Sequence, residues 1–404
     1  MIQLGSKLNL IICQKSKIDD WINHFFINYF SKVNYLFNLT DPVGFSEFIE
    51  KSTLDFFKGT VIGVINYELV FRRKELLDLE HFTLMLDESS LIQNENAKRS
   101  KFILQMKPDN VILLSGTPTG GKYETLWSQM KLLGWNISKK MFYNQYVDYH
   151  YEDNEGFPLM IIDGYKNEER LKRKMRAHGC HFLKTDEVFD LPEQMHQTIK
   201  IPTTKEYRIF KKDCIVMMHH PLKGGLMSAT DPNYDGVIEL VGDSTLTKML
   251  YERQLCGQYN AEKLEAFRDL VESTNDRLIV FYNFTEEWHQ MGAICDEIGR
   301  PSGVVNGQFK HLEAYEGKDN SITFIQYQAG AMGLNLQKAN KIVYFTPPLS
   351  SELFEQSKKR IHRIGQQKIC FYYYLTCKGS VEEKIYKTLE MRKDYTEALF
   401  EQEE

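Results

Sequence analysis

Short, almost continuous apolar runs recur along the chain, separated by stretches with helical spacing. Leu8–Cys13 is the first such run, and a polar turn and the amphipathic stretch Ile18–Phe26 follow it. A run of this length is typical of a strand buried on both faces of a parallel sheet. Further runs lie at Thr60–Tyr67, Phe82–Asp87, Asn110–Leu114, Arg277–Phe284, Val304–Gly307, Ser321–Tyr327 and Lys341–Phe345. Their alternation with helical stretches such as Ala261–Glu272 and Val381–Leu399 predicts an α/β fold with parallel sheets flanked by helices.

Composition adds limits to this picture. The 404 residues allow two or three domains, and 42% hydrophobic with 26% charged residues is ordinary for a globular protein. A net charge of −5 means that nucleic acid would have to be bound by a local patch. The seven cysteines form no Cys-x-x-Cys pair, which indicates free thiols in a reducing compartment. No apolar run has the length of a membrane span and no signal-peptide pattern begins the chain, so we expect a cytoplasmic protein without a membrane partner. The richness in Lys, Asn, Ile and Tyr suggests a bacterium or a phage-infected cell as the source.

Polar residues follow two of the predicted strands. Asp87 and Glu88 end the run that begins at Phe82, and Ser115-Gly-Thr-Pro118 follows Asn110–Leu114. The carboxyl ends of parallel strands line the crevice in which α/β sheets bind ligands. Two adjacent carboxylates there suit phosphoryl transfer, in which one holds Mg²⁺ and its neighbour positions the attacking water. The same pair is equally typical of a helix N-cap.

The stretch Gln356–Gln366 carries a concentration of positive charge. As a helix, it places Gln356, Arg360 and Arg363 on one face, turns Ile361 and Ile364 towards packing, and stops at Gly365. Guanidinium groups match phosphate oxygens, so an anion opposite this face would explain the pattern. The alternative is a solvated basic helix face.

The string from Gln356 to Gln366, with its His-Arg-Ile-Gly-Gln ending, resembles the sixth motif of the Swi/Snf-type branch of superfamily-two helicases and translocases. Strings similar to four further motifs of that family occur in the family's order, and the resemblance runs from about residue 8 to residue 390. It implies two RecA-like domains with ATP and Mg²⁺ in the cleft between them. In that arrangement Asp87 holds Mg²⁺, Glu88 positions water, and Arg360 and Arg363 reach the phosphates of ATP.

The resemblance also implies roles for other residues. Nucleotide contacts fall on Gln356, Gly333 and Asn335. Coupling of ATP state to domain closure falls on Ser90, Ser115, Gly116 and Thr117, with Ser90 standing where the family has His. DNA contacts fall on Ser16, Lys17, Asn66, Asn283, Ala329 and Gly330.

A basic tract at Lys166–Arg176 adds Lys172 and Arg173 as candidates for DNA phosphate contacts. For this tract the alternative is a solvated helix face, and for Ser16 and Lys17 it is an ordinary helix start. The expected partner is double-stranded DNA, with replication or recombination proteins as further candidates.

The phosphate-cradling string Gly-x-x-x-x-Gly-Lys-Ser/Thr does not occur in the 404 residues. Gly116–Tyr123 comes nearest, but Tyr follows its Lys122 and cannot bind Mg²⁺. We therefore expect that the chain begins just after its own P-loop. We also expect that the missing strand would lie beside the strand ending in Asp87, which exposes an apolar edge.

The predicted division is a first motor domain at residues 1–200, with a helical insertion at about 135–200, and a second at 201–404 with a C-terminal brace helix. The predicted function is an ATP-dependent DNA translocase. The alternatives are a non-hydrolysing DNA-binding or regulatory module and one half of a split ATPase.

Overall fold

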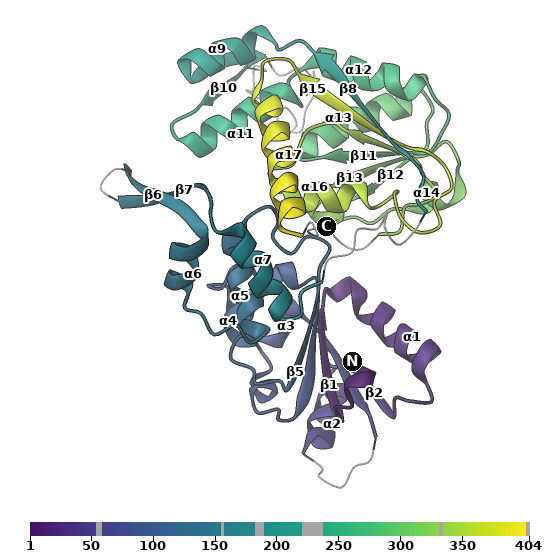
Figure 1. Cartoon of the computed structure of the whole chain (residues 1–404). Coiled ribbons are helices and arrows are strands. Elements are labelled where there is room, and N and C mark those ends of the chain that lie inside the picture. The colour runs from purple at the N-terminus through teal and green to yellow at the C-terminus, as the bar shows by residue number, and fades with distance from the viewer. Residues whose placement is uncertain (54–58, 155–156, 182–189, 220–236, 331–333, 401–404) are drawn as a thin grey trace. The chain divides into compact units, whose positions relative to one another are not determined.

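A computed structural model describes residues 1–53, 59–154, 157–181, 190–219, 237–330 and 334–400 (Figure 1). The chain divides into two compact units. The first comprises residues 1–182 with 392–404, and the second comprises residues 183–391.

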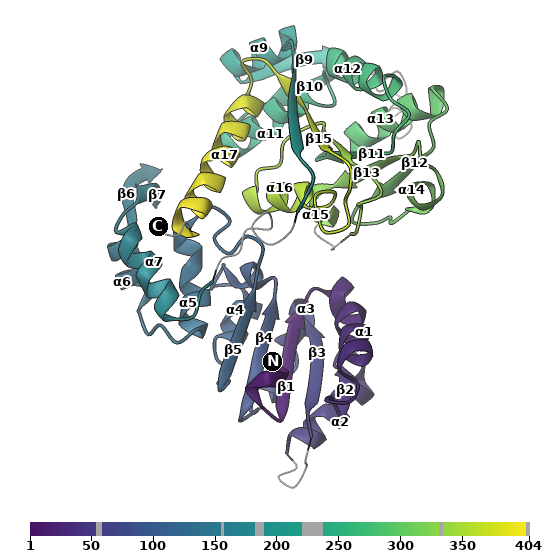
Figure 2. The same ribbon diagram turned by 45° about the vertical axis from the view of Figure 1, so that its right-hand side comes forward.

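The first unit is built on a sheet of five parallel strands in the order β2-β3-β1-β4-β5. These strands are β1 (Leu8–Cys13), β2 (Tyr35–Asn38), β3 (Val61–Asn66), β4 (Phe82–Asp87) and β5 (Asn110–Leu114). Figure 2 shows β1, β3, β4 and β5 side by side. Every residue of β1 and β3 is buried, as the continuous apolar runs predicted. The helices that follow the strands are α1 (Ile18–Tyr29), α2 (Pro42–Ser52), α3 (Tyr67–Val70) and α4 (Lys98–Ile103).

A smaller subdomain with its own core follows β5. Its elements are α5 (Trp127–Leu132), α6 (Lys139–Tyr146), β6 (Val147–Asn154), β7 (Phe157–Tyr165) and α7 (Glu168–Ala177). Leu171 and Met175 of α7 pack on Trp135, Phe142 and Tyr146. β6 and β7 form an antiparallel hairpin, which the expectation of a purely helical insertion did not include.

The second unit is built on a sheet of six parallel strands in the order β12-β13-β11-β14-β15-β8. These are β8 (Gln194–Ile201), β11 (Leu278–Tyr282), β12 (Ser302–Val305), β13 (Ile322–Gln326), β14 (Lys341–Tyr344) and β15 (Cys370–Cys377). Its helices are α9 (Lys205–Asp213), α11 (Thr245–Cys256), α12 (Ala261–Glu272), α13 (Thr285–Glu297), α14 (Glu313–Gly317), α15 (Tyr327–Gly330), α16 (Ser351–Lys358) and α17 (Val381–Phe400). A separate antiparallel pair, β9 (Ile215–His219) and β10 (Val237–Val241), packs beside α9 and α11.

The prediction of an α/β fold with parallel sheets is confirmed. The division of the chain differs in two respects from the expected domains at 1–200 and 201–404: residues 392–404 group with the first unit, and the second unit begins before residue 200. Residues 194–200 form most of β8, whose register with β15 begins at Gln194↔Cys370, so they belong to the second sheet. Among the described residues, no helix is both long enough and apolar enough to span a membrane.

Candidate functional site

Asp87 and Glu88 lie where the sequence placed them, at the carboxyl end of β4. The parallel register pairs Asp87 with Leu114, so the turn that starts at Ser115 leaves the sheet beside them. Glu88 has a φ of 59°, a left-handed conformation that is uncommon for a residue with a side chain. The chain therefore turns sharply at this pair, and the two carboxylates follow each other at the ligand-binding edge of the sheet.

Two buried or half-buried side chains hold this turn. The indole Nε1 of Trp21 in α1 donates to Asp87 Oδ2 at 2.9 Å. The hydroxyl of Tyr67, at the start of α3, donates to the backbone oxygens of Asp87 and Glu88 at 3.0 and 3.3 Å. Burial and then the Asp87 carboxylate raise the pKa of Tyr67, which keeps it a donor. Burial and then Asp87 also raise the pKa of the Cys13 thiol, to about 12, so Cys13 stays neutral at the end of β1.

A third side chain joins the two strand-end turns. Ser89 Oγ donates to Gln129 Oε1 at 2.9 Å, and Gln129 Nε2 donates to the backbone oxygen of Pro118 at 2.7 Å. Gln93 donates to the same oxygen at 3.0 Å. Ser90 and Thr117 are buried, and Thr117 N donates to Ser115 Oγ at 3.2 Å. Gln129, which the sequence did not single out, thus joins Ser89 and Pro118, the immediate neighbours of the predicted coupling residues Ser90 and Thr117.

The predicted DNA contacts of the first unit lie on three elements. Ser16 and Lys17 lie in the turn between β1 and α1, where Lys17 pairs with Asp20 at 2.7 Å. Asn66 ends β3 and donates to Glu68 at 2.7 Å. Lys172 pairs with Glu169 at 2.9 Å, whereas Arg173 is exposed on α7. The tract therefore has the exposed basic face that both of its interpretations require.

The glycine-rich turn after β5 has the opposite of a phosphate cradle's geometry. The backbone N–H groups of Gly120, Gly121 and Lys122 donate to Thr117 O, Thr119 Oγ1 and Thr119 O, respectively. A phosphate-binding loop needs N–H groups that point out towards the ligand. These three are used within the turn, so the string Gly116–Tyr123 does not form a phosphate-binding loop.

In the second unit, the prediction that Gln356–Gln366 forms one helix is wrong. α16 ends at Lys358, so Arg360 and Arg363 lie in the turns that follow and do not share a helix face with Gln356. Ile361 is fully buried as expected, but Ile364 is 58% exposed. The physical reason is that the backbone beyond Lys359 bonds to other parts of the unit. Leu336 N donates to Arg360 O at 3.3 Å, and Tyr372 OH donates to Lys358 O at 3.1 Å.

Side chains of the same string fix these turns. Gln366 is buried, and its Nε2 lies 3.1, 2.9 and 3.3 Å from the backbone oxygens of Gln337, Ala339 and Ile361. His362 Nε2 lies 2.9 Å from Pro192 O. Gly365 has a φ of 96°, the left-handed region that glycine adopts without strain. The string is therefore a folded loop that presents Arg360 and Arg363 from a fixed base.

The other predicted residues of the second unit are spread over several loops. Gln356 Nε2 donates to Glu352 at 3.3 Å, and Asn335 is exposed. Ala329 is buried in α15, which ends at Gly330, and Gly333 lies outside the described residues. The amide of Asn283 donates to Thr346 Oγ1 at 2.8 Å and to Pro347 O at 3.0 Å. These bonds connect the loop after β11 to the loop after β14.

A buried carboxylate lies behind Asn283. Glu287 Oε2 accepts from Asn283 N, Phe284 N and Thr346 Oγ1 at 3.0 to 3.1 Å. Its other oxygen is buried and has no hydrogen-bond partner among the described residues. Burial raises the pKa of Glu287 to about 7, against the three donors, which lower it. Desolvation also lowers the pKa of the buried Arg253 nearby.

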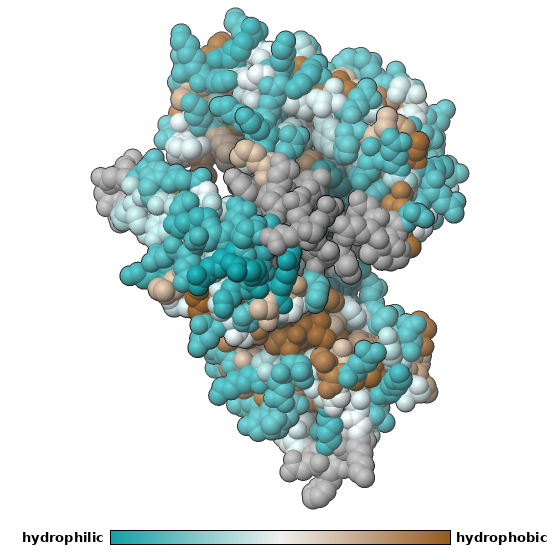
Figure 3. Space-filling view, viewed as in Figure 1, coloured by the Kyte–Doolittle hydropathy of each residue, from teal (hydrophilic) through white to brown (hydrophobic). Residues whose placement is uncertain are grey.

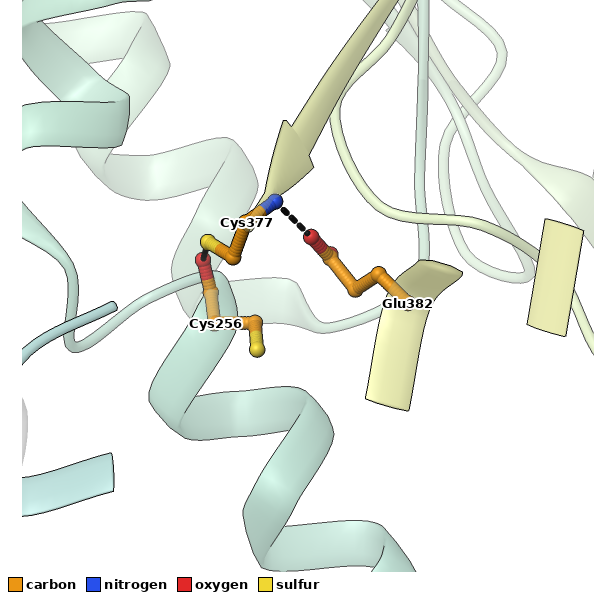
Figure 4. Close-up of side chains that lie close together, drawn as sticks. All are labelled: Cys256, Cys377 and Glu382. Carbon is orange, nitrogen blue, oxygen red and sulfur yellow. Dashed lines mark hydrogen bonds between the residues drawn. The ribbon is translucent and has the colours of Figure 1, made fainter. Parts of the chain in front are cut away.

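A second buried cluster joins Cys256 at the end of α11, Cys377 at the end of β15 and Glu382 at the start of α17 (Figure 4). Each could offer a metal ligand, and the 121-residue separation of the two cysteines hid the cluster from motif reading. Its contacts are already satisfied, however. Glu382 accepts from Lys263 Nζ at 2.6 Å and from Cys377 N at 2.9 Å, and the Cys377 thiol donates to Cys256 O at 3.4 Å. We therefore interpret the cluster as a structural junction of α11, β15 and α17, which includes the fully buried ion pair Lys263–Glu382.

The chain is similar to known proteins over most of its length. Residues 4–261 match the family described as the SNF2-related domain, and residues 262–365 match the helicase conserved C-terminal domain. Together the two matches span residues 4–365, which include the first sheet and every strand of the second sheet except β15.

Two curated relatives and one solved structure illustrate the similarity. "Putative ATP-dependent helicase/translocase YwqA" of Bacillus subtilis is 24% identical, over 82% of this chain and 37% of its own length. The SWI/SNF-related matrix-associated actin-dependent regulator of chromatin subfamily A member 1 of Mus musculus is 24% identical, over 82% and 33%. The chain thus spans about a third of the length of these relatives. The SWI2/SNF2 ATPase core of Sulfolobus solfataricus in complex with double-stranded DNA is 18% identical over 98% of this chain and 82% of its own, with a TM-score of 0.37. The expected phage origin has no support among these proteins.

Proposed function

Because the chain belongs to the SNF2-related family of ATP-dependent, DNA-stimulated ATPases, we propose that it is the motor part of a translocase that hydrolyses ATP while it tracks on the phosphates of duplex DNA. The observation that carries this proposal is the arrangement of side chains at the carboxyl ends of β4 and β5. Asp87 and Glu88 end β4, Ser115 to Thr117 follow the neighbouring β5, and Gln129 ties the two turns together.

The donor set at this edge fits Mg²⁺. Asp87 offers a hard carboxylate oxygen, and its other oxygen and its backbone are already oriented by Trp21 and Tyr67. We assign Asp87 to the metal and Glu88 to the attacking water. When bound, Mg²⁺ would neutralise charge on the β- and γ-phosphates of ATP.

We assign the phosphate-facing role in the second unit to Arg360 and Arg363. Their loop is fixed by Gln366, His362 and the backbone bond from Leu336, so the guanidinium groups are presented from a rigid base. Preorganised positive charge is what a transferring phosphoryl group requires. Gln356, Gly333 and Asn335 are proposed to contact the rest of the nucleotide.

The proposal still needs a phosphate-cradling loop, which the 404 residues do not contain. The open edge of β5 indicates where a strand carrying such a loop would join the sheet. β4 lies between β1 and β5, so the expected place beside β4 is already filled. Val111, Ile112 and Leu113 are half-buried and Leu114 is 40% exposed, and Figure 3 shows hydrophobic residues gathered around this strand. A parallel strand added there would end beside Ser115–Thr117.

For DNA, we propose contacts at the turn with Ser16 and Lys17, at Asn66, and at Lys172 and Arg173 of α7. In the second unit we propose the backbone at Ala329 and Gly330 and the loop of Asn283, whose amide is engaged internally. Contacts of this kind hold phosphates and read no bases. Replication or recombination proteins are proposed partners, and the cytoplasm of a bacterial cell is the proposed location.

The test measures ATP turnover with and without duplex DNA. The chain itself should hydrolyse little ATP. A fusion that adds an apolar strand, a Gly-x-x-x-x-Gly-Lys-Thr loop and a helix should hydrolyse it with strong stimulation by duplex. The control is the same fusion with Glu88→Gln, which keeps the fold and removes the carboxylate. A fusion that binds duplex and is as inactive as its Glu88→Gln control would contradict the motor proposal.

A second candidate is a DNA-binding or regulatory module without ATP hydrolysis, which the absent loop string favours. It predicts that duplex binds the chain and the fusion equally well and that neither shows DNA-stimulated turnover. One half of a split ATPase is the remaining alternative. It predicts that a separate polypeptide carrying the strand and loop restores turnover when mixed with the chain.

A further inference from the structure

The hydrogen bond between Trp21 and Asp87 joins two parts of the first unit. In the proposed function, one part contacts DNA and the other binds the metal ion. Trp21 lies one turn into α1, which begins directly after the turn carrying Ser16 and Lys17. Asp87 ends β4, and β1 and β4 are adjacent parallel strands with Ile12 opposite Leu86. The indole N–H of Trp21 crosses from the first element to the second at 2.9 Å.

We propose that Trp21 is a positioning residue that couples the turn at Ser16 and Lys17 to the metal-binding carboxylate of Asp87. The inference rests on the proposed function, because it presumes duplex contact at that turn and a divalent cation at Asp87. It adds the path between the two: a displacement of the amino-terminal turn of α1 changes the orientation of the Asp87 side chain through one hydrogen bond.

The surroundings of Trp21 make this bond a stiff connection. Trp21 stacks on Phe25, a buried residue of the same helix, with ring centroids 6.0 Å apart, and its ring edge meets His24 at 5.8 Å. Lys17 pairs with Asp20 at 2.7 Å, which ties the turn to the first turn of α1. Tyr67 fixes the backbone of Asp87 independently. The indole therefore orients the side chain of Asp87, while Tyr67, at the start of α3, holds its backbone.

The bond also leaves room for a cation. A carboxylate has about four lone-pair sites, so an oxygen that accepts one N–H bond leaves the other oxygen for a metal. Outer partners of metal-binding carboxylates typically change metal affinity by about 10- to 100-fold when removed. A similar loss is expected for Trp21→Phe, which keeps the ring packing and deletes the donor.

The chain supplies a matched control. Trp127 also donates an indole N–H, to the backbone oxygen of Ile137 at 2.9 Å, and does not bond to Asp87. Trp127→Phe therefore removes an equivalent hydrogen bond from the same unit. Mn²⁺, a paramagnetic substitute for Mg²⁺, is titrated into the full chain and its free fraction is read by electron paramagnetic resonance, with Asp87→Asn defining the site. Trp21→Phe should weaken Mn²⁺ binding at this site by about tenfold or more, and Trp127→Phe should leave it unchanged.

The second arm follows the ¹⁵N–¹H indole signals of the four tryptophans. Asp87→Asn should move the Trp21 signal upfield, because a charge-assisted hydrogen bond is lost. Duplex DNA should move the Trp21 signal and leave that of Trp127 in place. Wild-type Mn²⁺ affinity in Trp21→Phe, or a Trp21 signal that stays fixed while duplex binding is seen by fluorescence anisotropy, would overturn the coupling. A chain that binds no duplex would overturn the coupling together with the DNA role in the proposed function, and anisotropy separates that case from the others.

Discussion

The two parallel sheets end in different ways. β5, one of the two edge strands of the first sheet, is the apolar run Asn-Val-Ile-Leu-Leu. It has the composition of a central strand, yet β4 is its sole partner among the described strands. The edge of the second sheet, β8, reads Gln-Met-His-Gln-Thr-Ile-Lys-Ile, and most of its residues are exposed. Polar edge strands are how natural sheets avoid further pairing. The difference supports the proposal that a further strand joins the first sheet at β5, whereas the polar sequence of β8 disfavours further pairing there.

The same contrast holds for the side chains near each candidate site. In the second unit Gln366, Glu287, Arg253 and the Lys263–Glu382 pair lie in dense internal networks. In the first unit the carboxylates of Asp87 and Glu88 stand at the sheet edge nearest the open strand. We expect changes to these buried groups of the second unit to act on stability, and changes to the two carboxylates of the first unit to act on ligand binding.

The largest expected effect comes from the arginines. In a form of the protein that hydrolyses ATP, Arg360→Ala or Arg363→Ala should lower turnover by about 10³- to 10⁵-fold, the range known for phosphate-facing arginines. Duplex affinity should change little. Lys359→Ala, the neighbouring basic residue, is the control. Turnover close to wild type in both arginine variants would remove the second unit from the proposed ATP site.

The buried Lys263–Glu382 pair should give the next largest effect. Lys263→Met leaves the fully buried Glu382 carboxylate without its ion-pair partner, so it should lower the free energy of unfolding by about 3–5 kcal/mol. The double variant Lys263→Met/Glu382→Gln removes both charges and should recover most of that loss. Urea unfolding followed by Trp288, with the three tryptophans of the first unit changed to Phe, reports on the second unit alone. A double variant as unstable as the single one would argue against an ion-pair junction.

The raised pKa of Glu287 predicts that the stability of the second unit depends on pH. Burial raises its pKa to about 7 from an ordinary value of 4.5, so between these values the folded protein keeps a proton that the unfolded chain releases. Stability should therefore be highest below pH 4.5 as far as this group is concerned, and should fall by about 3 kcal/mol as pH rises through 7. Glu287→Gln, which cannot ionise, should flatten the profile between pH 5 and pH 8. Parallel profiles for the two proteins would show that Glu287 is ionised throughout.

The basic tract on α7 should give the smallest effect. If it lies on the DNA path, Lys172→Glu with Arg173→Glu should flatten the salt dependence of duplex binding by about one to two units of log–log slope. Lys310→Glu with Lys318→Glu changes two exposed lysines outside the tract and is the matched control. Equal slopes for both double variants would identify the tract as a solvated helix face.

The sequence predicted those features that depend on local patterns. The apolar runs gave the strands, and the strand ends gave Asp87, Glu88 and Ser115–Thr117. It could not give Trp21, Tyr67 or Gln129, because their bonds to this site span 66, 20 and 40 residues and follow no periodicity. The Cys256–Cys377–Glu382 junction was hidden for the same reason.

The helix predicted over Gln356–Gln366 failed for a related reason. Its spacing is helical, but Leu336 N and Tyr372 OH bond to the backbone oxygens of Arg360 and Lys358 and tie this backbone to other parts of the unit. Helical spacing shows that a segment can form a helix by itself. In the folded protein, tertiary hydrogen bonds give this segment a different conformation after Lys358. The expected place of the missing strand, beside the strand ending in Asp87, was also wrong, because β1 and β5 flank that strand. The order of strands in a sheet follows from packing that no single run encodes.

Hydrogen exchange at the two edge strands tests the central claim most directly, namely that the first sheet takes up a further strand at β5 and so completes the nucleotide site. The amide exchange of β5 and β8 is measured in the chain and in the fusion that adds the strand and loop. The account predicts that the fusion slows exchange in β5 by at least about tenfold and leaves β8 unchanged, since new ladder hydrogen bonds form only at the open edge. Unchanged exchange in β5 in a fusion that hydrolyses ATP, or protection that appears at β2 instead, would contradict it.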